Sequence, residues 1–398
     1  MKLALLVLYA SGEAYGGAHD PPSLLPSPSC MLNNESCPIP RGWEVDWSVI
    51  NSTALMASRG SAEEFNPVHR WGYVTLDWQA GWKRWVKRDP RKATCEATSS
   101  DNCVRLKQAG KVKRCGIYHN MQLALEWLES ERVVMDDAHV KQGWFLTYPN
   151  GTVFDQKQHV PTPEAAWQST INMSQWVIDW RNADAADYFV GAILNSTFLP
   201  GVDATFTDDL PGVGSEDKAM IPATRLTNTS VAAIRRATQQ AEMSLASALA
   251  ISGKFCWDCV GGEDGPAGTS YSMNQQPPPN TTAGCTAWFR HYCKPEMQGR
   301  GMFLGWSPTQ PAPTEAMAAF LIARGPYAFV GGRGLRDSAP TDNWHPLFGL
   351  DVGEPLELCQ EHAQGVFTRR WSKGTAALDC NRYQGELPFP RLPDSELY

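Results

Sequence analysis

Carboxylates stand directly after two apolar runs of this 398-residue sequence. Asp208 and Asp209 follow the run 202–207, and Asp179 ends the run 176–179. Cleavage of a glycosidic bond needs two carboxyl groups about 5 to 9.5 Å apart, one on either side of the bond. We therefore predict Asp208, Asp209 and Asp179 as candidate catalytic residues.

Asp208 and Asp209 are neighbours in the sequence, and successive side chains of a strand point to opposite faces. We expect one of the two carboxylates to face the substrate while the other caps the next helix or forms an ion pair in a loop. Asp is also common in turns and at helix N-caps, and Leu210-Pro211-Gly212 follows at once. The alternative that the sequence leaves open is that both residues serve only as turn and cap.

Polar and aromatic side chains near the ends of several apolar runs can bind sugar hydroxyl groups or stack on sugar rings. The predicted substrate-binding residues are Asp77, Trp78, Tyr118, Asn120, Arg181, Asn182, Trp257 and Arg324. Trp180 is a further stacking candidate. His119 suits hydroxyl recognition but is interpreted as structural. Two alternatives stay open: Arg181 pairs with Asp208, and Arg324 caps the end of a helix.

Apolar strand-like runs that alternate with helix-like segments identify the elements that must position these residues. The runs lie at 73–77, 113–118, 176–179, 202–207, 253–257 and 327–330, and the helical patterns lie at 121–133, 185–196, 231–250 and 315–325. This alternation predicts an α/β fold with a parallel sheet. Polar residues at the ends of successive strands are typical of a (β/α)8 barrel, whose active site lies at one rim, so we predict a barrel.

The predicted organisation has four parts. A signal peptide at 1–16 precedes an irregular Pro- and Ser-rich segment at 17–66, the barrel at 67–352 and a C-terminal β extension with the tail at 353–398. Two hairpins are expected. One turns at Pro149-Asn-Gly151, and the other turns at Lys373-Gly374 within the C-terminal extension.

Resemblance to barrel glycoside hydrolases is carried by the segments WFLTYPNGTVF, WVIDWRNADAADYFVGAIL and GVDATFTDD. In those enzymes an Asp-containing strand end precedes a helix, and the next strand ends in a carboxylate. The α-galactosidase clan and several uncharacterised secreted families share the arrangement. The later segments AAFLIARGPYAFVGG, LDVGEP and GVFTRRWSKGTAALDC are similar to the ends of such hydrolases. The resemblance spans about residues 70–382, and it departs from the characterised clan because no later strand carries a second carboxylate in a recognisable acid/base motif.

A signal peptide and a set of N-glycosylation sites predict a secreted protein, extracellular or of the cell wall. Lys2, the apolar residues 3–10 and small residues at positions 10–16 are typical of a signal peptide. Asn-x-Ser/Thr sequons predict N-glycosylation at Asn34, Asn51, Asn150, Asn172, Asn195, Asn228 and Asn280.

The eleven cysteines are typical of an oxidising compartment. Four pairs are close enough in sequence to close small loops: Cys30 with Cys37, Cys95 with Cys103, Cys285 with Cys293, and Cys359 with Cys380. An odd number leaves at least one thiol free or paired elsewhere, and the sequence does not define the connectivity.

Composition and missing motifs exclude several function classes. A net charge of −7 with 19% charged residues argues against a nucleic-acid partner, and no apolar run is long enough to predict a membrane span. Residues 77–81 after the first strand are not a dinucleotide-binding fingerprint, and residues 331–334 lack the spacing of one, so no cofactor is expected. Cys256-Trp-Asp-Cys259 stands without a second pair of ligands, so no metal is expected. Two functions remain, both with a carbohydrate partner: a secreted glycoside hydrolase, and a non-catalytic carbohydrate-binding or cell-wall protein on a degenerate barrel.

Overall fold

The computed structural model describes residues 47, 50, 52–57, 71–77, 94–137, 143–158, 174–209, 217–258, 276–298, 302–306, 312–325, 328–332 and 344–393. The strands are β1 (Ser52–Ala57), β2 (Trp71–Leu76), β3 (Val112–Asn120), β4 (Leu123–Leu125), β5 (Gln175–Val177), β6 (Ala204–Asp208), β7 (Phe255–Asp258), β8 (Met302–Trp306), β9 (Ala328–Gly332), β10 (Gln360–Ala363), β11 (Val366–Trp371), β12 (Gly374–Asp379) and β13 (Gln384–Glu386). The α-helices are α3 (Cys95–Gln108), α4 (Glu129–Asp136), α6 (Ala183–Thr197), α7 (Asp217–Thr224), α8 (Asn228–Ile251), α9 (Thr282–Tyr292), α10 (Pro295–Gln298) and α11 (Pro313–Ala323).

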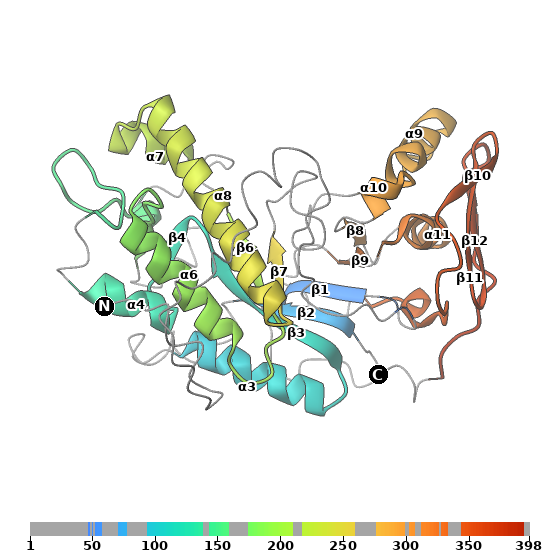
Figure 1. Ribbon diagram of the computed structural model, residues 1–398, viewed down its shortest axis with the longest axis horizontal. Coiled ribbons are helices and arrows are strands. Elements are labelled where there is room, and N and C mark those ends of the chain that lie inside the picture. Colours follow the sequence, from blue (N-terminus) through green and yellow to red (C-terminus); the bar gives the residue numbers. More distant parts are fainter. Residues whose placement is uncertain are drawn as a thin grey trace, which may run out of the picture.

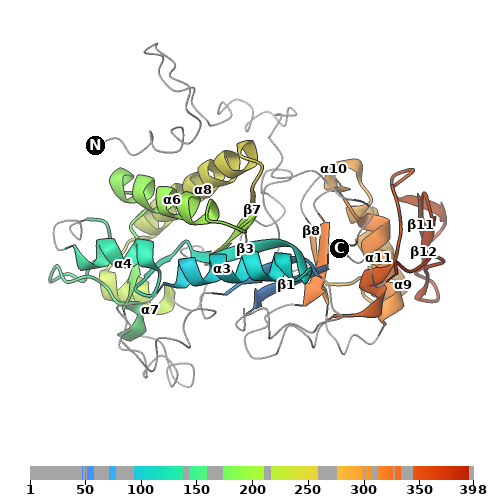
Figure 2. The same ribbon diagram turned by 90° about the horizontal axis from the view of Figure 1, so that it is seen from below.

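A parallel seven-stranded sheet forms the centre of the molecule (Figure 1). Its order is β7-β6-β3-β2-β1-β9-β8. The strands β1, β2, β3, β6 and β7 thus lie side by side in their order along the chain, and β9 returns to lie beside β1, with β8 next to β9. Helices α3, α6 and α8 pack against β3, β6 and β7, and Figure 2 shows α3 running alongside the sheet. The predicted α/β class is confirmed, and the strand order differs from that of a doubly wound sheet.

The sheet is strongly curved. The rings of Phe255 on β7 and Phe329 on β9 lie 6.3 Å apart, although five strand spacings separate these strands along the sheet. In a flat sheet the same strands would be about 24 Å apart. Side chains of β2, β3, β6, β7 and β9 therefore share one buried cluster on the concave face. Within the described residues no pairing joins β7 to β8, so a closed barrel is not detected there.

Several predicted elements need correction. β1 lies inside the stretch 17–66, for which the composition predicts irregular chain, and it is nevertheless a central strand. The strand β8 was not predicted at all. The run 176–179 begins in β5 (Gln175–Val177), which pairs with β4 in a separate two-stranded antiparallel sheet and not in the parallel one. The predicted helix 121–133 is β4 followed by α4, because the apolar residues 123–125 are all buried and pair with β5 as a strand.

The first predicted hairpin is confirmed. Tyr148 N donates to Thr152 O at 2.8 Å, and Thr147 and Val153 form an antiparallel bridge around the turn. In the C-terminal hairpin of β11 and β12, Trp371 pairs with Gly374. The two-residue loop is therefore Ser372-Lys373, one position before the predicted turn.

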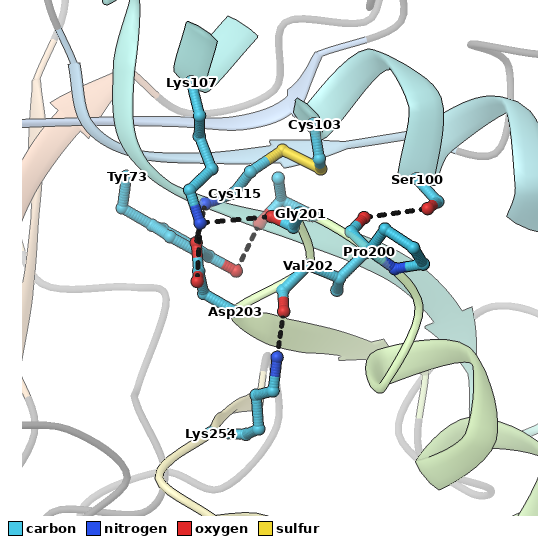
Figure 3. Close-up of a disulfide and its surroundings, with 11 residues drawn as sticks. Tyr73, Ser100, Cys103, Lys107, Cys115, Pro200, Gly201, Val202, Asp203 and Lys254 are labelled. Atoms are coloured by element: carbon cyan, nitrogen blue, oxygen red, sulfur yellow. Dashed lines mark hydrogen bonds and ion pairs between the residues drawn. A yellow bond between two sulfur atoms is a disulfide. The ribbon is translucent and has the colours of Figure 1, made fainter. Parts of the chain in front are cut away.

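Figure 3 shows how α3 is fixed to the sheet. A disulfide joins Cys103 on α3 to Cys115 on β3, and Lys107 Nζ lies 2.9 Å from each carboxylate oxygen of Asp203. Asp203 also accepts a hydrogen bond from Cys115 N at 2.9 Å. The disulfide holds α3 to β3, and the ion pair holds α3 to the residue before β6. Together they fix the start of β6 beside β3, so that the two strands end side by side.

Gly116 on β3 leaves room for Tyr73, whose hydroxyl accepts a hydrogen bond from Thr75 Oγ1. A Cβ at position 116 would lie 2.3 Å from Tyr73 Oη and 3.1 Å from the Ala204 carbonyl oxygen. We predict that Gly116→Ala lowers the free energy of unfolding by about 1 to 3 kcal/mol, the usual cost of overpacking a core. Urea unfolding followed by tryptophan fluorescence measures this change.

The matched control is Gly191→Ala on α6, where no atom lies within 4 Å of the added Cβ. It is expected to leave stability unchanged or raise it by up to about 1 kcal/mol, since Ala is the better helix former. Equal stability of both variants and the wild type would contradict the close approach of Tyr73 to Gly116.

The C-terminal strands β10 to β13 form an antiparallel sheet at one end of the molecule. Both figures show α11 between this sheet and β9 (Figures 1 and 2). Residues 316–323 of α11 are all buried, and they share a core with Val330, Phe367 and Leu378. A helix that is apolar on every side must be covered on every side, and here two sheets cover it.

Two further disulfides join α9 to this C-terminal sheet, and they differ from the expected short loops. Cys285 bonds to Cys380, and Cys293 bonds to Cys359. Cys285 and Cys293 are eight residues apart along one helix and its end, a rise of about 12 Å, which a disulfide does not span. The same spacing on α3 separates Cys95 from Cys103, and Cys95 is a free buried thiol. Cys30, Cys37 and Cys259 lie outside the described residues.

Candidate active site

Asp208 is the last residue of β6 and lies on the concave face of the sheet. Two residues earlier on the same face, the ring of Phe206 stacks on that of Tyr118, with centroids 5.9 Å apart. Tyr118 Oη donates a hydrogen bond to Asp208 Oδ2 at 2.9 Å. The amide of Asp209 donates to the other carboxylate oxygen at 3.1 Å. These two donors hold the Asp208 carboxylate in one orientation.

The carboxylate of Asp209 faces the same strand, contrary to the expectation that the two side chains diverge. Asp209 Oδ2 accepts a hydrogen bond from Asn120 Nδ2 at 2.8 Å. The regular strand ends at Asp208, and Asp209 has a φ of 53°, in the left-handed region that Asp adopts more readily than most residues. This reversal of the backbone removes the strict alternation on which the expectation rested.

Asn120 connects the two carboxylates. Its Oδ1 accepts from the backbone N–H groups of Gln122 and Leu123, each at 2.8 Å, so its Nδ2 must point to the site. Besides bonding to Asp209, Nδ2 donates to Tyr118 Oη at 2.9 Å. Tyr118 therefore accepts from Asn120 and donates to Asp208, and every hydrogen of this small network has a defined acceptor.

A third carboxyl group belongs to the same end of the sheet. Asp77 directly follows β2 and is fully buried, and the pairing of Leu76 with Ile117 places it level with Tyr118. Burial raises the pKa of Tyr118 well above its usual range, and the charges of Asp208, Asp209 and Asp77 raise it further, against a lowering by the hydrogen bond with Asn120. Tyr118 therefore stays protonated and acts as a donor throughout the physiological pH range.

Asp179, Arg181 and Asn182 form a separate group. Arg181 makes a bidentate ion pair with Asp179, at 2.8 and 2.7 Å, and does not pair with Asp208. The Asn182 side chain caps α6 by accepting from Ala185 N at 3.1 Å. These side chains follow β5, which is not part of the parallel sheet that carries Asp208.

Arg324 lies at the opposite end of the sheet, where α11 ends and β9 is about to begin. Its buried guanidinium lies over the rings of Trp47 and Trp371, with centroid distances of 5.0 and 5.4 Å. Burial lowers the pKa of Lys113, at the start of β3, to about 8, with further lowering by Arg114 and Arg324. Arg324 is thus at the amino ends of the strands and far from Tyr118 at the other end of β3.

The tryptophan candidates fall into two groups. Trp180 is buried and donates from Nε1 to Met121 O at 2.5 Å, so it packs in the core and offers no free face to a sugar. Trp78 and the side chain of Trp257 lie outside the described residues.

Asn150, Asn195, Asn228 and Asn280 are exposed, and the remaining sequon asparagines lie outside the described residues. In the described part of the chain no three His, Cys, Asp or Glu side chains are grouped to hold a metal ion. Among the helices that the structure describes, none has the length and apolar character needed to cross a membrane.

No protein-family model and no curated protein matches this chain. Solved structures of low similarity include glycoside hydrolases. An uncharacterised protein of Listeria monocytogenes matches with a TM-score of 0.44 and 13% identity, covering 77% of this chain and 30% of that one. A GH31 dextranase of Flavobacterium johnsoniae matches with a TM-score of 0.40 and 10% identity, covering 74% and 38%. A maltogenic α-amylase of Thermotoga neapolitana matches with a TM-score of 0.42 and 11% identity, covering 84% and 86%.

The chain spans about a third of the length of the first two of these proteins. The resemblance to the α-galactosidase clan stays a prediction.

Proposed function

We propose that the chain is a secreted glycoside hydrolase whose working carboxyl groups are Asp208 and Asp209 on β6 and Asp77 on β2. The observation that carries this proposal is the meeting of these carboxyl groups around Tyr118 and Asn120 at the carboxyl end of a curved parallel sheet. In barrel enzymes this end of the sheet is where substrates bind. Asp77, predicted from the sequence as a substrate-binding residue, takes the place of Asp179, which Arg181 engages.

The spacing of the strands suits the chemistry. Only β3 separates β2 from β6, and Asp208 lies two residues beyond the level of Asp77, so the backbones that carry these two residues lie about 12 Å apart. Side chains on a concave face converge from there. Glycosidases place their two carboxyl groups about 5 to 9.5 Å apart. Asp208, held by Tyr118, is the group that stabilises or attacks the oxocarbenium-like centre.

The proposal includes a barrel that closes between β7 and β8. The contact of Phe255 with Phe329 supports closure, because it brings β7 within side-chain reach of the strand beside β8. The proposed organisation is the one expected from the sequence, a signal peptide at 1–16, a segment at 17–66, the barrel at 67–352 and the C-terminal part at 353–398, with β1 now added to the barrel.

The test is hydrolysis of a panel of aryl glycosides and oligosaccharides by the glycosylated chain from a secretory host. Release of reducing ends or aryl alcohol, with loss in the carboxylate variants, supports the proposal. Binding of an oligosaccharide without any cleavage across the panel would overturn it and favour a carbohydrate-binding protein.

Secretion makes a separate prediction. We expect N-glycans on several of the seven sequons, since the four described ones, Asn150, Asn195, Asn228 and Asn280, are exposed to a transferase. The protein made in a eukaryotic secretory host should lose mass when a glycan-removing amidase acts on it, and the mature chain should start near residues 15 to 20. An unchanged mass would contradict passage through the secretory pathway.

A further inference from the structure

A buried group of ionisable side chains lies on the convex side of β3, behind the candidate site. His119 stands between Tyr118 and Asn120 in the strand and therefore points the opposite way, toward α3, α4 and α6. Its Nε2 lies 2.6 Å from Ser196 Oγ and 3.9 Å from Glu96 Oε1, and its Nδ1 lies 3.7 Å from Glu131 Oε1. The side chains of His119 and Glu131 are 0% and 2% exposed.

The two glutamates differ in their donors. Glu96 accepts from the backbone N–H and the hydroxyl of Ser130, at 2.9 and 2.7 Å, and so caps the first turn of α4. Glu129 caps α3 in return, through Glu96 N at 2.9 Å. Glu131 Oε2 accepts from Leu125 N at 2.5 Å, and Glu131 Oε1 faces the imidazole. The remaining titratable neighbour is Tyr188 on α6, whose hydroxyl donates to Ser130 O at 2.7 Å.

The hydrogen bonds define the tautomer of His119. Ser196 has one hydroxyl hydrogen, and it donates this hydrogen to Ile193 O at 2.9 Å. Ser196 Oγ must then accept from His119, so Nε2 carries a hydrogen, in agreement with the Glu96 carboxylate beside it. In the neutral imidazole Nδ1 is consequently an acceptor, and it faces another acceptor, Glu131 Oε1. At 3.7 Å the two atoms form no hydrogen bond, and His119 Nδ1 is a buried atom without a hydrogen-bond partner. One proton on the pair removes the cost of two buried acceptors that face each other.

We propose that Glu131 and His119 hold one buried proton between Oε1 and Nδ1, which the folded chain keeps at a pH where the unfolded chain has released it. This inference concerns the stability of the fold and does not depend on the proposed glycosidase activity. Burial raises the pKa of Glu131 well above its usual range, with a smaller rise from Glu96 and an opposing hydrogen bond from Leu125. Burial lowers the pKa of His119, against a smaller rise caused by Glu96.

Proton counting gives the sign of the effect. In the unfolded chain Glu131 loses its proton near pH 4.5 and His119 near pH 6.5. Between these values both states hold one proton on the pair, so this pair makes no pH-dependent contribution. Above pH 6.5 only the folded state keeps the proton, and each further pH unit favours unfolding tenfold until the folded pair also releases it. Below pH 4.5 the unfolded state holds two protons, so stability falls again with falling pH.

The experiment compares the wild type with Glu131→Gln, which keeps the shape and a donor for Nδ1 but has no titratable proton. Urea unfolding at pH 5.5, 6.5 and 7.5 gives the ratio of unfolding equilibrium constants, wild type over variant. We expect this ratio to rise tenfold per pH unit, about 100-fold in all, because unfolding of the two proteins differs by one proton over the whole range. Below pH 6.5 the variant takes up a proton on His119 when it unfolds, and above pH 6.5 the wild type releases the shared one. A ratio that is constant over this range would overturn the proposal.

The matched control is Glu129→Gln, two residues earlier on the same helix, whose carboxylate accepts backbone N–H bonds at the start of α3. Its ratio is expected to change by less than about twofold over the same range. If Glu131→Gln does not fold, nitrogen NMR of the histidine-labelled wild type at pH 7 decides the matter. An imidazole protonated at Nε2 whose Nδ1 signal shows a bound or hydrogen-bonded proton supports the shared proton. A neutral imidazole protonated at Nε2 with a free Nδ1, or one protonated at Nδ1 with Nε2 as acceptor, overturns it.

Discussion

Replacement of Asp208 by Asn is expected to lower kcat about 10³-fold or more on any glycoside that the wild-type chain cleaves. Asn keeps the shape of the side chain and can accept from Tyr118 Oη, but it carries no negative charge to stabilise or attack an oxocarbenium-like centre. The same change at Asp209 is also expected to lower kcat, because the Asp209 carboxylate is hydrogen-bonded to Asn120, which in turn donates to Tyr118. Steady-state rates on the best substrate of the panel measure both effects.

The control for this comparison is Asp179→Asn. Asp179 is paired with the exposed Arg181, so its replacement is expected to leave kcat within about threefold of the wild type and to cost under about 1 kcal/mol of stability. Far-UV circular dichroism and urea unfolding show whether each variant is folded. Near-wild-type turnover of both Asp208→Asn and Asp209→Asn would mean that the two residues serve only as turn and cap.

Loss of both disulfides between α9 and the C-terminal sheet is expected to lower the free energy of unfolding by about 8 kcal/mol. With one of the two bonds intact, the loop that the other closes is only about 30 residues long, because the remaining bond shortens the path between Cys285 and Cys380. Each single removal is therefore expected to cost about 3.6 kcal/mol, less than half of the joint effect.

Paired Cys→Ser variants test this prediction by urea unfolding. Removal of Cys103–Cys115, which closes a loop of sequence separation 12, is the reference and is expected to cost about 2.8 kcal/mol. The joint loss of about 8 kcal/mol is comparable to the whole stability of an ordinary domain. A joint loss no larger than that of the reference pair would show that the packing of α11, and not the disulfides, holds the C-terminal sheet in place.

Local patterns in the sequence located most of the elements but not their partners. Both the run 202–207 and the run 176–179 predict a strand, and the structure places the first in the parallel sheet and the second in a separate antiparallel pair. Hydrophobic periodicity reports that a strand is buried, and it carries no information on which sheet buries it. The same limit applies to β1, whose pairing with β2 and β9 is set by residues far along the chain.

The candidate site shows a similar division. Asp208 was predicted from its position at a strand end, and Tyr118 and Asn120 from the end of the neighbouring strand, because parallel strands end at a common edge. The turn of Asp209 toward the same strand depends on one left-handed residue, which the assumption of a regular strand excluded. The burial of Glu96 and Glu131 was not predicted either, since charged residues in the first turn of a helix are usually exposed.

The position of α11 has a consequence for how this molecule can be divided. One side of the helix packs against the parallel sheet, and the other side packs against the C-terminal sheet. On that second side Gly385 lies so close to the helix that a Cβ would be 3.1 Å from Glu315 Cα. A chain that stopped before β10 would present an apolar helix to water and would aggregate. The C-terminal strands are therefore no detachable module that recombination could exchange for another, and the two sheets have to be inherited as one unit.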